Sequence, residues 1–209
     1  MLKLYSVPIS LYCAKLRIVL RHKRLEWQEL PPPGGYGSDE YKRLVPAGNL
    51  PALDHDGLLI GDSEAIAEYL NEVFPAPDML PGDAAARARI RGLSRFHDTR
   101  LEPALRAMFP NIGTQGRDDS LIAQQWAALQ QRLEQIEPLI PDHRESLTLA
   151  DCGMAITGTW IDCLALHWGC DPIVPASVQR YLEGLAEHEA VAGELAEYRP
   201  RLVDWLADK

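Results

Sequence analysis

The stretch LPALDHDGLLIGDSEAIAEYL, residues 50–70, decides the fold of the N-terminal part of the chain. Two short apolar runs in it, 51–54 and 58–60, are separated by His-Asp-Gly, and Asp-Gly between apolar runs is a strong signal for a β-hairpin. A helix then begins at Asp62 or Ser63, since both residue types cap helix N-termini. The side chains expected to face inward from this helix are Ile66, Leu70 and Val73. The stretch therefore predicts two antiparallel strands followed by an amphipathic helix.

Two further strands and two helices are expected upstream of this stretch. Leu2–Tyr5 and the alternating run Leu25–Leu30 are predicted strands, and Leu11–His22 between them is a predicted helix. A single helical crossover makes these two strands parallel. The segment PPPGGYG, residues 31–37, breaks regular structure, and a short helix is expected over Ser38–Leu44. The N-terminal α/β domain therefore has the element order βαβαββα.

The chain then changes to an all-helical domain. Residues 1–74 end at the segment 75–83, whose prolines and glycine exclude a helix or strand, so this segment is the expected linker. Apolar residues recur at spacings of three and four through residues 84–209. The helices expected there are one long helix from Ile90 to Met108 that Pro103 kinks, and helices at 122–136, 149–167, 178–185 and 190–206. The helix 149–167 is apolar nearly all round and is therefore expected to be central.

Composition and charge are those of an ordinary globular protein. The chain has 209 residues, of which 46% are hydrophobic and 24% charged, so it can bury a core and wholesale disorder is excluded. A formal net charge of −9 argues against non-specific nucleic-acid binding, because phosphates would repel the protein. No apolar run reaches the roughly 18 residues that span a bilayer, and the N-terminus has no signal-peptide pattern. We therefore expect no nucleic-acid or membrane partner and a cytoplasmic location.

The four cysteines predict neither a disulfide scaffold nor a metal site. No Cys-x-x-Cys pair and no Cys/His cluster has the spacing of a zinc site. Cys152, Cys163 and Cys170 lie in or near an apolar helical stretch and are expected to be small buried side chains. Cys13 has a different setting, at the start of the first helix.

Four motifs follow one another along the chain. They are Leu4–Leu20, which begins LYSVPIS; Val45–Leu53, VPAGNLPAL; Asp62–Leu70, DSEAIAEYL; and Thr148–Asp151, TLAD, a capping box. Together with the α/β domain, the proline-rich linker and the helical domain, they resemble the cytosolic glutathione S-transferases of the bacterial serine-type or zeta/beta-like kind, over essentially the whole chain. The resemblance implies a thioredoxin-like N-terminal domain, an enzyme with glutathione as co-substrate, no metal, and a homodimer.

The second and third motifs supply the residues that would bind glutathione. Pro51 begins a strand, and the family's proline at this point is cis, which leaves the backbone of Leu50 free to pair with an extended peptide. Asp62 and Ser63 lie at a helix N-terminus, where free N–H groups attract the γ-glutamyl carboxylate, with Asp62 near the ammonium group. Where the family often has Lys or Gln for the glycyl carboxylate, this chain has Asn49.

Asn49 brings no charge, so Lys42, Arg43 or an arginine of the long helix is expected to supply it. The arginines of this region are Arg87, Arg89, Arg91, Arg95, Arg100 and Arg106. Two interpretations stay open for them: a solvated face with ion pairs, or a contribution to a dimer interface and to the glutathione carboxylates. The residues expected to line the second-substrate pocket of the helical domain are His97, Arg100, Met108 and Trp160, with a structural role as the alternative for each.

Ser10 is the residue expected to activate the glutathione thiol. The thiolate is the nucleophile, and a hydrogen-bond donor near the sulfur stabilises it. Ser10 lies just before the first helix, at the position from which family serines donate to the sulfur. The alternatives are Ser6, a reactive thiol at Cys13, and no activating side chain. Tyr5 is expected to pack in the strand.

The function that the resemblance implies is glutathione S-transferase activity on a small hydrophobic electrophile, as in detoxification. A zeta-like glutathione-dependent isomerase or dehalogenase is the alternative, although those enzymes carry a Ser-Ser-Cys run and this chain has Ser10-Leu-Tyr-Cys13. A non-catalytic binding protein of the same fold is the third possibility. Retained glutathione contacts at Pro51, Asp62 and Ser63 favour an enzyme over it.

Overall fold

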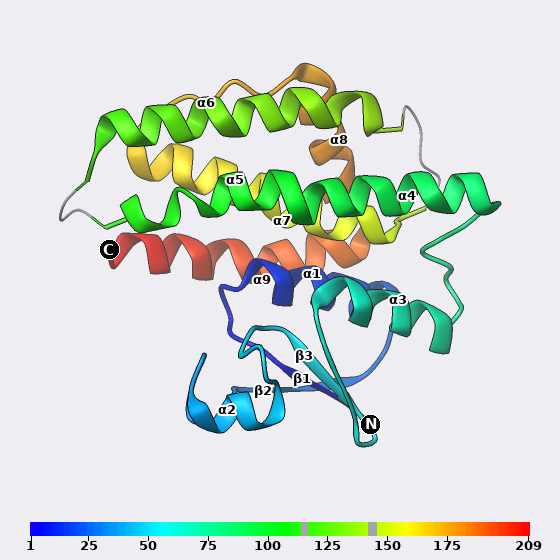
Figure 1. Cartoon of the computed structure of the whole chain (residues 1–209). Helices are drawn as coiled ribbons and strands as arrows, with labels where there is room; N and C mark the ends of the chain where they lie inside the picture. The colour runs from blue at the N-terminus through cyan, green and yellow to red at the C-terminus, as the bar shows by residue number, and fades with distance from the viewer. Residues whose placement is uncertain (114–116, 142–145) are drawn as a thin grey trace. The chain divides into compact units, whose positions relative to one another are not determined.

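The computed structural model describes residues 1–113, 117–141 and 146–209. The chain divides into two compact units, Met1–Met79 and Leu80–Lys209. Within the described residues, Figure 1 shows strands in the first unit and helices throughout the second. The boundary between the units lies in the segment expected to be the linker, and residues 74–83, all of them described, contain neither helix nor strand.

A four-stranded mixed sheet forms the frame of the first unit. Its strands are β1 Leu2–Tyr5, β2 Trp27–Leu30, β3 Ala52–His55 and β4 Leu58–Gly61, in the order β2-β1-β3-β4. β1 runs parallel to β2 and antiparallel to β3, and β3 pairs with β4 in the expected hairpin. The predicted parallel and antiparallel pairings are confirmed. β2 begins later than expected because the Leu25 N–H still bonds to Leu20 O, 3.0 Å away, in the preceding helix.

Three helices cover this sheet: α1 Leu11–His22, α2 Asp39–Leu44 and α3 Ser63–Val73. α1 and α3 lie side by side on one face of the sheet, and α2 lies on the other (Figure 1). The alternation of side chains along the strands explains this arrangement. Leu4 and its cross-strand partner Leu53 are fully buried. The neighbouring pair, Tyr5 and Ala52, points the opposite way and packs with Tyr41 of α2.

The inward face of α3 is predicted correctly except at its end. Ile66 and Leu70 are fully buried, whereas Val73 is 42% exposed, so that prediction is wrong. Periodicity places Val73 on the same face, but the helix ends there, at the surface. Phe74 packs instead against His55, with ring centroids 5.8 Å apart.

A buried lysine fixes the last part of the first unit. Lys23 is 5% exposed, and its Nζ donates to Oδ1 of Asn71 at 2.9 Å. It also donates to the backbone oxygens of Phe74, at 2.7 Å, and Pro77, at 2.8 Å. Burial lowers the pKa of Lys23, and the charge of Asp78 opposes that shift. Lys23 therefore ties the C-terminal ends of α1 and α3 to the segment that follows them.

The described part of the second unit is helical. Its elements are α4 Ala84–Phe96, the π-helical turn η1 His97–Leu101, α5 Glu102–Arg106, the short turns η2 Phe109–Asn111 and η3 Glu137–Leu139, α6 Asp119–Ile136, α7 Leu149–Trp168, α8 Ala176–Ala186 and α9 Glu189–Ala207. α7 packs against α4, α8 and α9, and is the central helix that the sequence predicts. By length and composition alone, α7 is long and apolar enough to cross a membrane. However, 78% of its apolar window is buried inside the protein, as in a core helix.

The long helix predicted from Ile90 to Met108 is interrupted before its proline. α4 ends at Phe96, the π-helical turn η1 follows, and Pro103 is at the start of α5. Proline has no N–H, and an N–H in the first turn of a helix would have no partner within that helix anyway. Pro103 therefore fits the first turn of α5, and the irregular turn lies before it. The predicted kink is therefore a π-helical turn that precedes Pro103.

The cysteines of the helical unit do not all share one environment. Cys152 and Cys163 are buried as predicted, but Cys170 is exposed and the prediction for it is wrong. Gly169 ends α7 in the left-handed conformation, with φ 64°. Because this turn leads the chain away from the apolar helix, the residue after it no longer packs in the core.

Replacing Lys23 with Met should lower the free energy of unfolding by about 2–4 kcal/mol, because an amide oxygen and two carbonyls lose a charged donor. Lys3→Met is the matched control, since Lys3 pairs at the surface with Asp54 at 3.5 Å, and it should cost less than about 0.5 kcal/mol. Urea unfolding followed by tryptophan fluorescence measures both values. Equal losses in the two variants would contradict the anchoring role of Lys23.

Candidate functional site

The register of the β3–β4 hairpin brings the two predicted ligand-binding motifs to one edge of the sheet. Ala52 pairs with Gly61 across the hairpin. Leu50 and Ser63 each lie two residues beyond this pair, on the two opposed chains, so both come to the same end of the hairpin. β1 also ends at this edge, because Tyr5 pairs with Ala52.

Leu50 presents an unpaired backbone at this edge. The Leu50–Pro51 peptide is cis, and within the described residues neither the N–H nor the C=O of Leu50 has a hydrogen-bond partner. The Leu50 side chain packs in a buried cluster with Cys13 and Tyr41. The Tyr41 hydroxyl donates to the carbonyl of Asn49 at 3.0 Å. Packing therefore holds this backbone in place, and its polar groups are available to an extended peptide.

Asp62 caps α3 and occupies two of the N–H groups that the sequence analysis assigns to an anion. Its φ is 74°, in the left-handed region that residues other than glycine seldom adopt. Its Oδ1 accepts the N–H groups of Glu64, at 2.9 Å, and Ala65, at 3.1 Å. These two N–H groups are thus occupied. The Ser63 hydroxyl has no hydrogen-bond partner among the residues that the structure describes, so it stays the candidate donor to an anion.

A buried ion pair that the sequence analysis missed joins the two helices of the site. Lys15 of α1 and Glu64 of α3 lie 2.7 Å apart, Nζ to Oε2, and their side chains are 1% and 9% exposed. Each buried charge needs the other, because removal of either leaves its partner uncompensated. The pair therefore fixes the start of α3 against α1. The sequence does show a lysine among the apolar residues of the predicted helix Leu11–His22. Periodicity indicates that such a lysine faces inward, but it does not identify the residue with which it pairs.

Ser10 is the N-cap of α1. Its Oγ accepts the Cys13 N–H at 3.3 Å, and its own N–H donates to Val7 O at 3.2 Å. A hydroxyl oxygen that accepts a hydrogen bond keeps its own proton for a further partner. Ser10 is only partly buried, so a ligand can reach its hydroxyl.

The alternatives to Ser10 have surroundings that suit activation less well. Ser6 is 6% exposed, and its Oγ donates to Oε2 of Glu29 at 2.9 Å. Cys13 has no exposed surface. Burial raises the pKa of its thiol, and a hydrogen bond with Ser10 opposes that rise to a smaller extent. A buried, protonated thiol is a poor nucleophile, so these surroundings favour Ser10 as the activator.

Asn49 and the basic side chains proposed near it, Lys42 and Arg43, are exposed. Gly48 has φ 63°, and the Lys42 side chain lies across it. The positive φ favours glycine here, whereas a Cβ at residue 48 would meet only the exposed Lys42 side chain, 3.0 Å away at Cγ, which can shift. Lys42 therefore runs beside the loop that carries Asn49, which favours Lys42 over Arg43 as the charge near it.

Three of the four residues expected at a second-substrate pocket lie in the core of the helical unit. His97, Met108 and Trp160 are 1%, 0% and 2% exposed. The His97 ring is bonded on both sides, Nδ1 to Asp98 at 2.7 Å and Nε2 to Thr157 at 2.8 Å. The side chain of His97 thus has the contacts of a structural residue.

Trp160 is also engaged within the core, whereas Arg100 is not. Trp160 Nε1 donates to the Tyr198 hydroxyl at 2.7 Å, and its ring stacks on Phe109 with centroids 4.5 Å apart. Arg100 is exposed. The structural role named as the alternative fits the three buried residues, and the second-substrate pocket stays a prediction.

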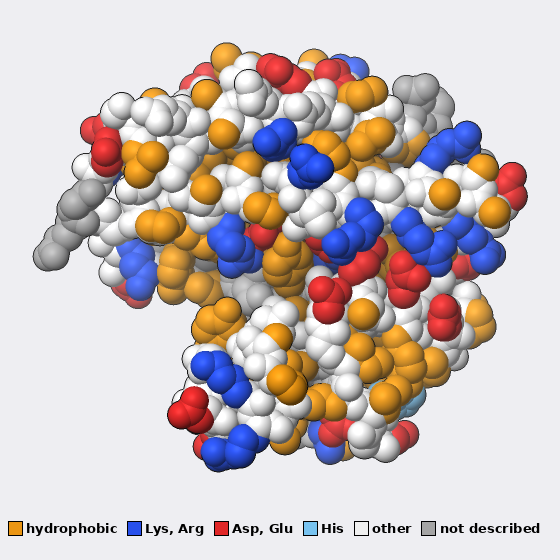
Figure 2. Space-filling model, in the orientation of Figure 1, with side chains coloured by type: hydrophobic (Ala, Val, Ile, Leu, Met, Phe, Trp, Pro, Cys, Tyr) orange, Lys and Arg blue, Asp and Glu red, His pale blue; other side chains and the backbone are white. Residues whose placement is uncertain are grey.

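The arginines of α4, η1 and α5 lie mostly at the surface of the helical unit. Figure 2 shows Lys and Arg side chains gathered along α4. Arg106 pairs with Glu102 four residues before it. Arg95 lies 4.0 Å from Asp98. These two contacts fit the interpretation as a solvated face with ion pairs.

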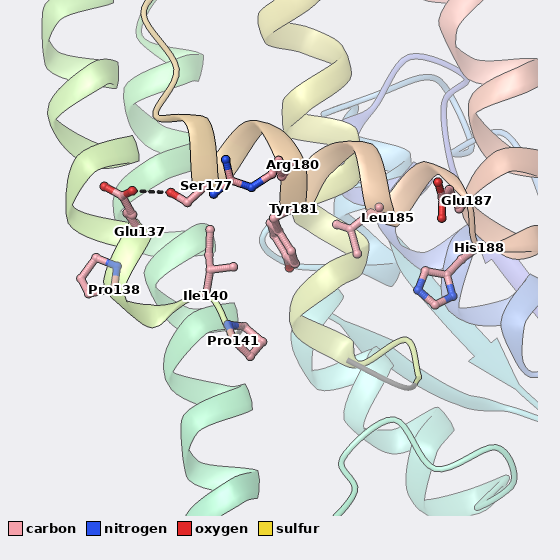
Figure 3. Close-up of a pocket in the computed structure, with 11 residues that line it drawn as sticks. Glu137, Pro138, Ile140, Pro141, Ser177, Arg180, Tyr181, Leu185, Glu187 and His188 are labelled. Atoms are coloured by element: carbon pink, nitrogen blue, oxygen red, sulfur yellow. Dashed lines mark hydrogen bonds between the residues drawn. The ribbon is translucent and has the colours of Figure 1, made fainter. Parts of the chain in front are cut away.

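A pocket of about 970 Å³ lies in the helical unit between α8 and the segment 137–141 (Figure 3). Its hydroxyl groups are engaged: Ser177 donates to Glu137, and Tyr181 donates to the buried Asp151 at 2.5 Å. The charged side chains that line it include Glu137, Arg180 and Glu187. With both signs of charge present, the pocket indicates no class of ligand. In the described ranges, no group of three or more His, Cys, Asp or Glu side chains could hold a metal ion.

The chain is similar to known proteins in sequence and in fold. The family description "Glutathione S-transferase, N-terminal domain" matches residues 4–78. The maleylacetoacetate isomerase of Pseudomonas aeruginosa is 35% identical over 149 residues, 68% of this chain and 70% of that protein. A stringent starvation protein A homolog of Coxiella burnetii is 26% identical over 203 residues, 95% of this chain and 93% of that protein. A glutathione S-transferase structure from Rhodospirillum rubrum has a TM-score of 0.75 and 27% identity, and covers 93% of this chain and 92% of its own.

The native protein should show one fast-reacting cysteine with an aromatic disulfide reagent at neutral pH. Cys170 is exposed and the other three thiols are buried, so the others should react at least about 100-fold more slowly. Nearby protein atoms partly desolvate the Cys170 thiol and raise its pKa, so its reaction should quicken as the pH rises. The fast phase should vanish in Cys170→Ser and persist in Cys13→Ser. Loss of the fast phase in Cys13→Ser would instead identify Cys13 as a reactive thiol.

Proposed function

The chain belongs to the glutathione S-transferase family of enzymes, and on that basis we propose that it adds the glutathione thiolate to a small hydrophobic electrophile. Glutathione is a short peptide with a cysteine at its centre, so its site needs a backbone partner, an anion site and a thiol activator. The observation that carries the proposal is that the three candidate groups lie on the segments that lead out of β1, into β3 and out of β4 at one edge of the sheet. They are the Leu50 backbone, the Ser63 hydroxyl and the Ser10 hydroxyl.

Each part of glutathione has a proposed partner in the first unit. The central peptide pairs its N–H and C=O with Leu50, as an added strand does. The γ-glutamyl carboxylate accepts a hydrogen bond from Ser63 at the N-terminus of α3, where the helix dipole favours an anion. Asp62, the residue before Ser63, is the proposed partner of the ammonium group. The glycyl carboxylate contacts Asn49, and Lys42 supplies the positive charge.

Ser10 then activates the sulfur. Its proton donates to the sulfur and favours the thiolate over the thiol, which lowers the pKa of bound glutathione. A free thiol titrates near about 8.5, so a shift of about two units makes the thiolate the major form at neutral pH. The thiolate attacks the electrophilic atom of the second substrate, and a carbon–sulfur bond forms as the leaving group departs.

Glutathione-dependent isomerisation is the second candidate function. The relative that is 35% identical to this chain is named a maleylacetoacetate isomerase. In an isomerisation the thiolate adds to the substrate and later leaves it, so the same activating serine would serve both reactions. The residue after Ser10 is the buried Leu11, where a Ser-Ser-Cys run would have a second serine. Assays separate the two functions, because transfer consumes glutathione whereas isomerisation returns it.

A non-catalytic binding role is the third candidate. The Coxiella burnetii relative, which aligns over nearly the whole chain, has a name that denotes a starvation protein. The position of Ser10 argues against this role, because a protein that only binds glutathione would not need a hydroxyl that stabilises the thiolate. Retention on immobilised glutathione without turnover of any electrophile or isomerisable substrate would favour it.

The assembly and the compartment are proposals that follow from family membership. We expect a homodimer, since two-fold dimers are the commonest assembly of soluble proteins and the family is commonly dimeric. We also expect the enzyme to act in the cytoplasm, on electrophiles that it detoxifies.

Ser10→Ala should lower turnover with a model aryl halide by about 10- to 1000-fold, the range for loss of one electrostatic donor. Glutathione affinity should change by less than about threefold, because the sulfur contact is a small part of the peptide's contacts. Ser6→Ala is the matched control and should keep turnover, since the Ser6 hydroxyl is bonded to Glu29. Steady-state kinetics measures all three proteins. Unchanged turnover in Ser10→Ala would overturn the assignment of the activator.

Ser63→Ala should weaken glutathione binding by about 1–3 kcal/mol, which is a loss of about 5- to 150-fold in affinity. Titration calorimetry measures it. The Ser63 hydroxyl has no partner among the described residues, so the same substitution should change the free energy of unfolding by less than about 0.5 kcal/mol. Unchanged affinity, or a loss of stability as large as the loss of binding, would contradict a direct contact with the ligand.

A further inference from the structure

The turn that carries Ser10 is exposed at its centre. The turn is closed by a hydrogen bond from the Ser10 N–H to Val7 O, at 3.2 Å, and Pro8 between these two residues is exposed. Proline has no N–H, so the backbone of Pro8 can be held by a hydrogen bond only through its carbonyl. The position of the Ser10 hydroxyl therefore depends in part on what binds the Pro8 carbonyl.

Arg17 of α1 binds this carbonyl. Its Nη2 donates to Pro8 O at 3.2 Å. The side chains of a helix tilt toward its N-terminus, so an arginine two turns into α1 reaches back to the turn that precedes the helix. Ser10 is the N-cap of the same helix. Arg17 therefore contacts the turn two residues before Ser10.

The Arg17 guanidinium is buried and forms an ion pair. Its side chain is 4% exposed, and its Nη1 lies 3.5 Å from Oε1 of Glu29, whose side chain is 38% exposed. A buried cation needs an anion and hydrogen bonds to compensate for the loss of water around it. Glu29 lies on β2, the strand parallel to β1. Arg17 therefore joins α1 to both the turn Val7–Ser10 and the sheet.

The two contacts of Arg17 suit a side chain with several donors. A guanidinium has five N–H donors in a rigid plane, and the two terminal nitrogens of Arg17 contact different partners, a carbonyl and a carboxylate. The residues on either side, Leu16 and Ile18, are fully buried apolar side chains. Packing of α1 alone would be served by an apolar side chain at residue 17, so the contacts account for the arginine.

We propose that Arg17 is a positioning residue for the thiol-activating serine: its guanidinium, oriented by Glu29, holds the turn Val7–Ser10 so that the Ser10 hydroxyl stays within hydrogen-bond distance of the glutathione sulfur. This inference rests on the proposed function, in which Ser10 activates glutathione. Arg17 acts through the turn rather than on the ligand. Its effect on turnover can still be large, because misplacement of a reacting group by about 1 Å can lower a rate about 100-fold.

Arg17→Met removes both donors but keeps a long side chain, and should lower kcat with a model aryl halide by about 10- to 100-fold. Glutathione affinity, measured by titration calorimetry, should change by less than about threefold, because the proposed contacts of Leu50 and Ser63 lie outside this turn. Arg21→Met is the matched control and should keep both values, since the Arg21 guanidinium lies over the Trp27 ring. A loss of affinity as large as the loss of kcat would overturn the positioning role.

Arg17→Lys separates the contacts from packing. Lysine keeps the charge and can donate to Pro8 O, although it lacks the planar fork of donors. Its kcat should therefore lie between those of the wild-type protein and Arg17→Met. If Arg17 acted only by filling space, the apolar methionine would replace it better than a buried lysine would. A kcat of Arg17→Met equal to or above that of Arg17→Lys would thus contradict the proposal.

Combination with Ser10→Ala separates this inference from the proposed function. Once the Ser10 hydroxyl is absent its position no longer matters, so Arg17→Met should lower kcat by less than about threefold in the Ser10→Ala background. Unchanged kcat in Ser10→Ala means that the proposed activation fails. If Ser10→Ala loses turnover, two results overturn the role of Arg17 alone: a full further loss from Arg17→Met in that background, or no loss from Arg17→Met by itself.

The same comparison stays possible if Arg17→Met does not fold. Arg17→Lys then replaces it, with a smaller loss of kcat that should likewise disappear in the Ser10→Ala background. Persistence of that loss in the double variant would overturn the positioning role.

Discussion

The antiparallel register of β3 and β4 is the constraint on which the candidate site depends. A slip by one residue would turn every side chain of a strand to the other face and move Leu50 away from Ser63. The turn fixes the register: Asp56 and Gly57 have φ values of 52° and 94°, the two positive values of the turn that suits a two-residue hairpin. The Gly57 N–H also donates to Asp54 at 2.8 Å. Residues at one end of the hairpin thus set the spacing of the ligand groups at the other.

The two helix N-termini at this edge are capped by different side-chain groups, a hydroxyl at α1 and a carboxylate at α3. Ser10 caps α1 with a hydroxyl, which satisfies a helix N–H and still has a proton to donate. Asp62 caps α3 with a carboxylate, which accepts two helix N–H groups and has no proton to give. The aspartate relieves Ser63 of the capping role, so the Ser63 hydroxyl can serve the ligand. In the proposed function, the donor for the sulfur and the donor for a carboxylate therefore come from the N-termini of two different helices.

Most of the fold could be predicted because its signals are local. The Asp-Gly turn, the capping residues and the proline-rich segment each act within a few residues, and the structure follows them. The errors concern the ends of helices and contacts across the fold. Val73 and Cys170 lie where a helix ends, and periodicity does not say where that is. The ion pair of Lys15 and Glu64 joins residues far apart in the sequence, so packing decides it.

The residues expected at a second-substrate pocket show what an amphipathic pattern leaves open. Periodicity identifies the side chains that face inward, but an inward face lines either a core or a cavity. His97 is polar and faces inward, yet its two ring nitrogens are bonded and its ring fills the space beside Gly153, where a Cβ would come within 2.5 Å of it. Its hydrogen-bonding capacity is fully used within the protein. Ser63 differs, because its hydroxyl has no hydrogen-bond partner among the described residues, and Ser10 differs in being only partly buried. Unused hydrogen-bonding capacity at a helix N-terminus, rather than polarity on an inward face, therefore distinguishes the candidate ligand-binding residues of this chain.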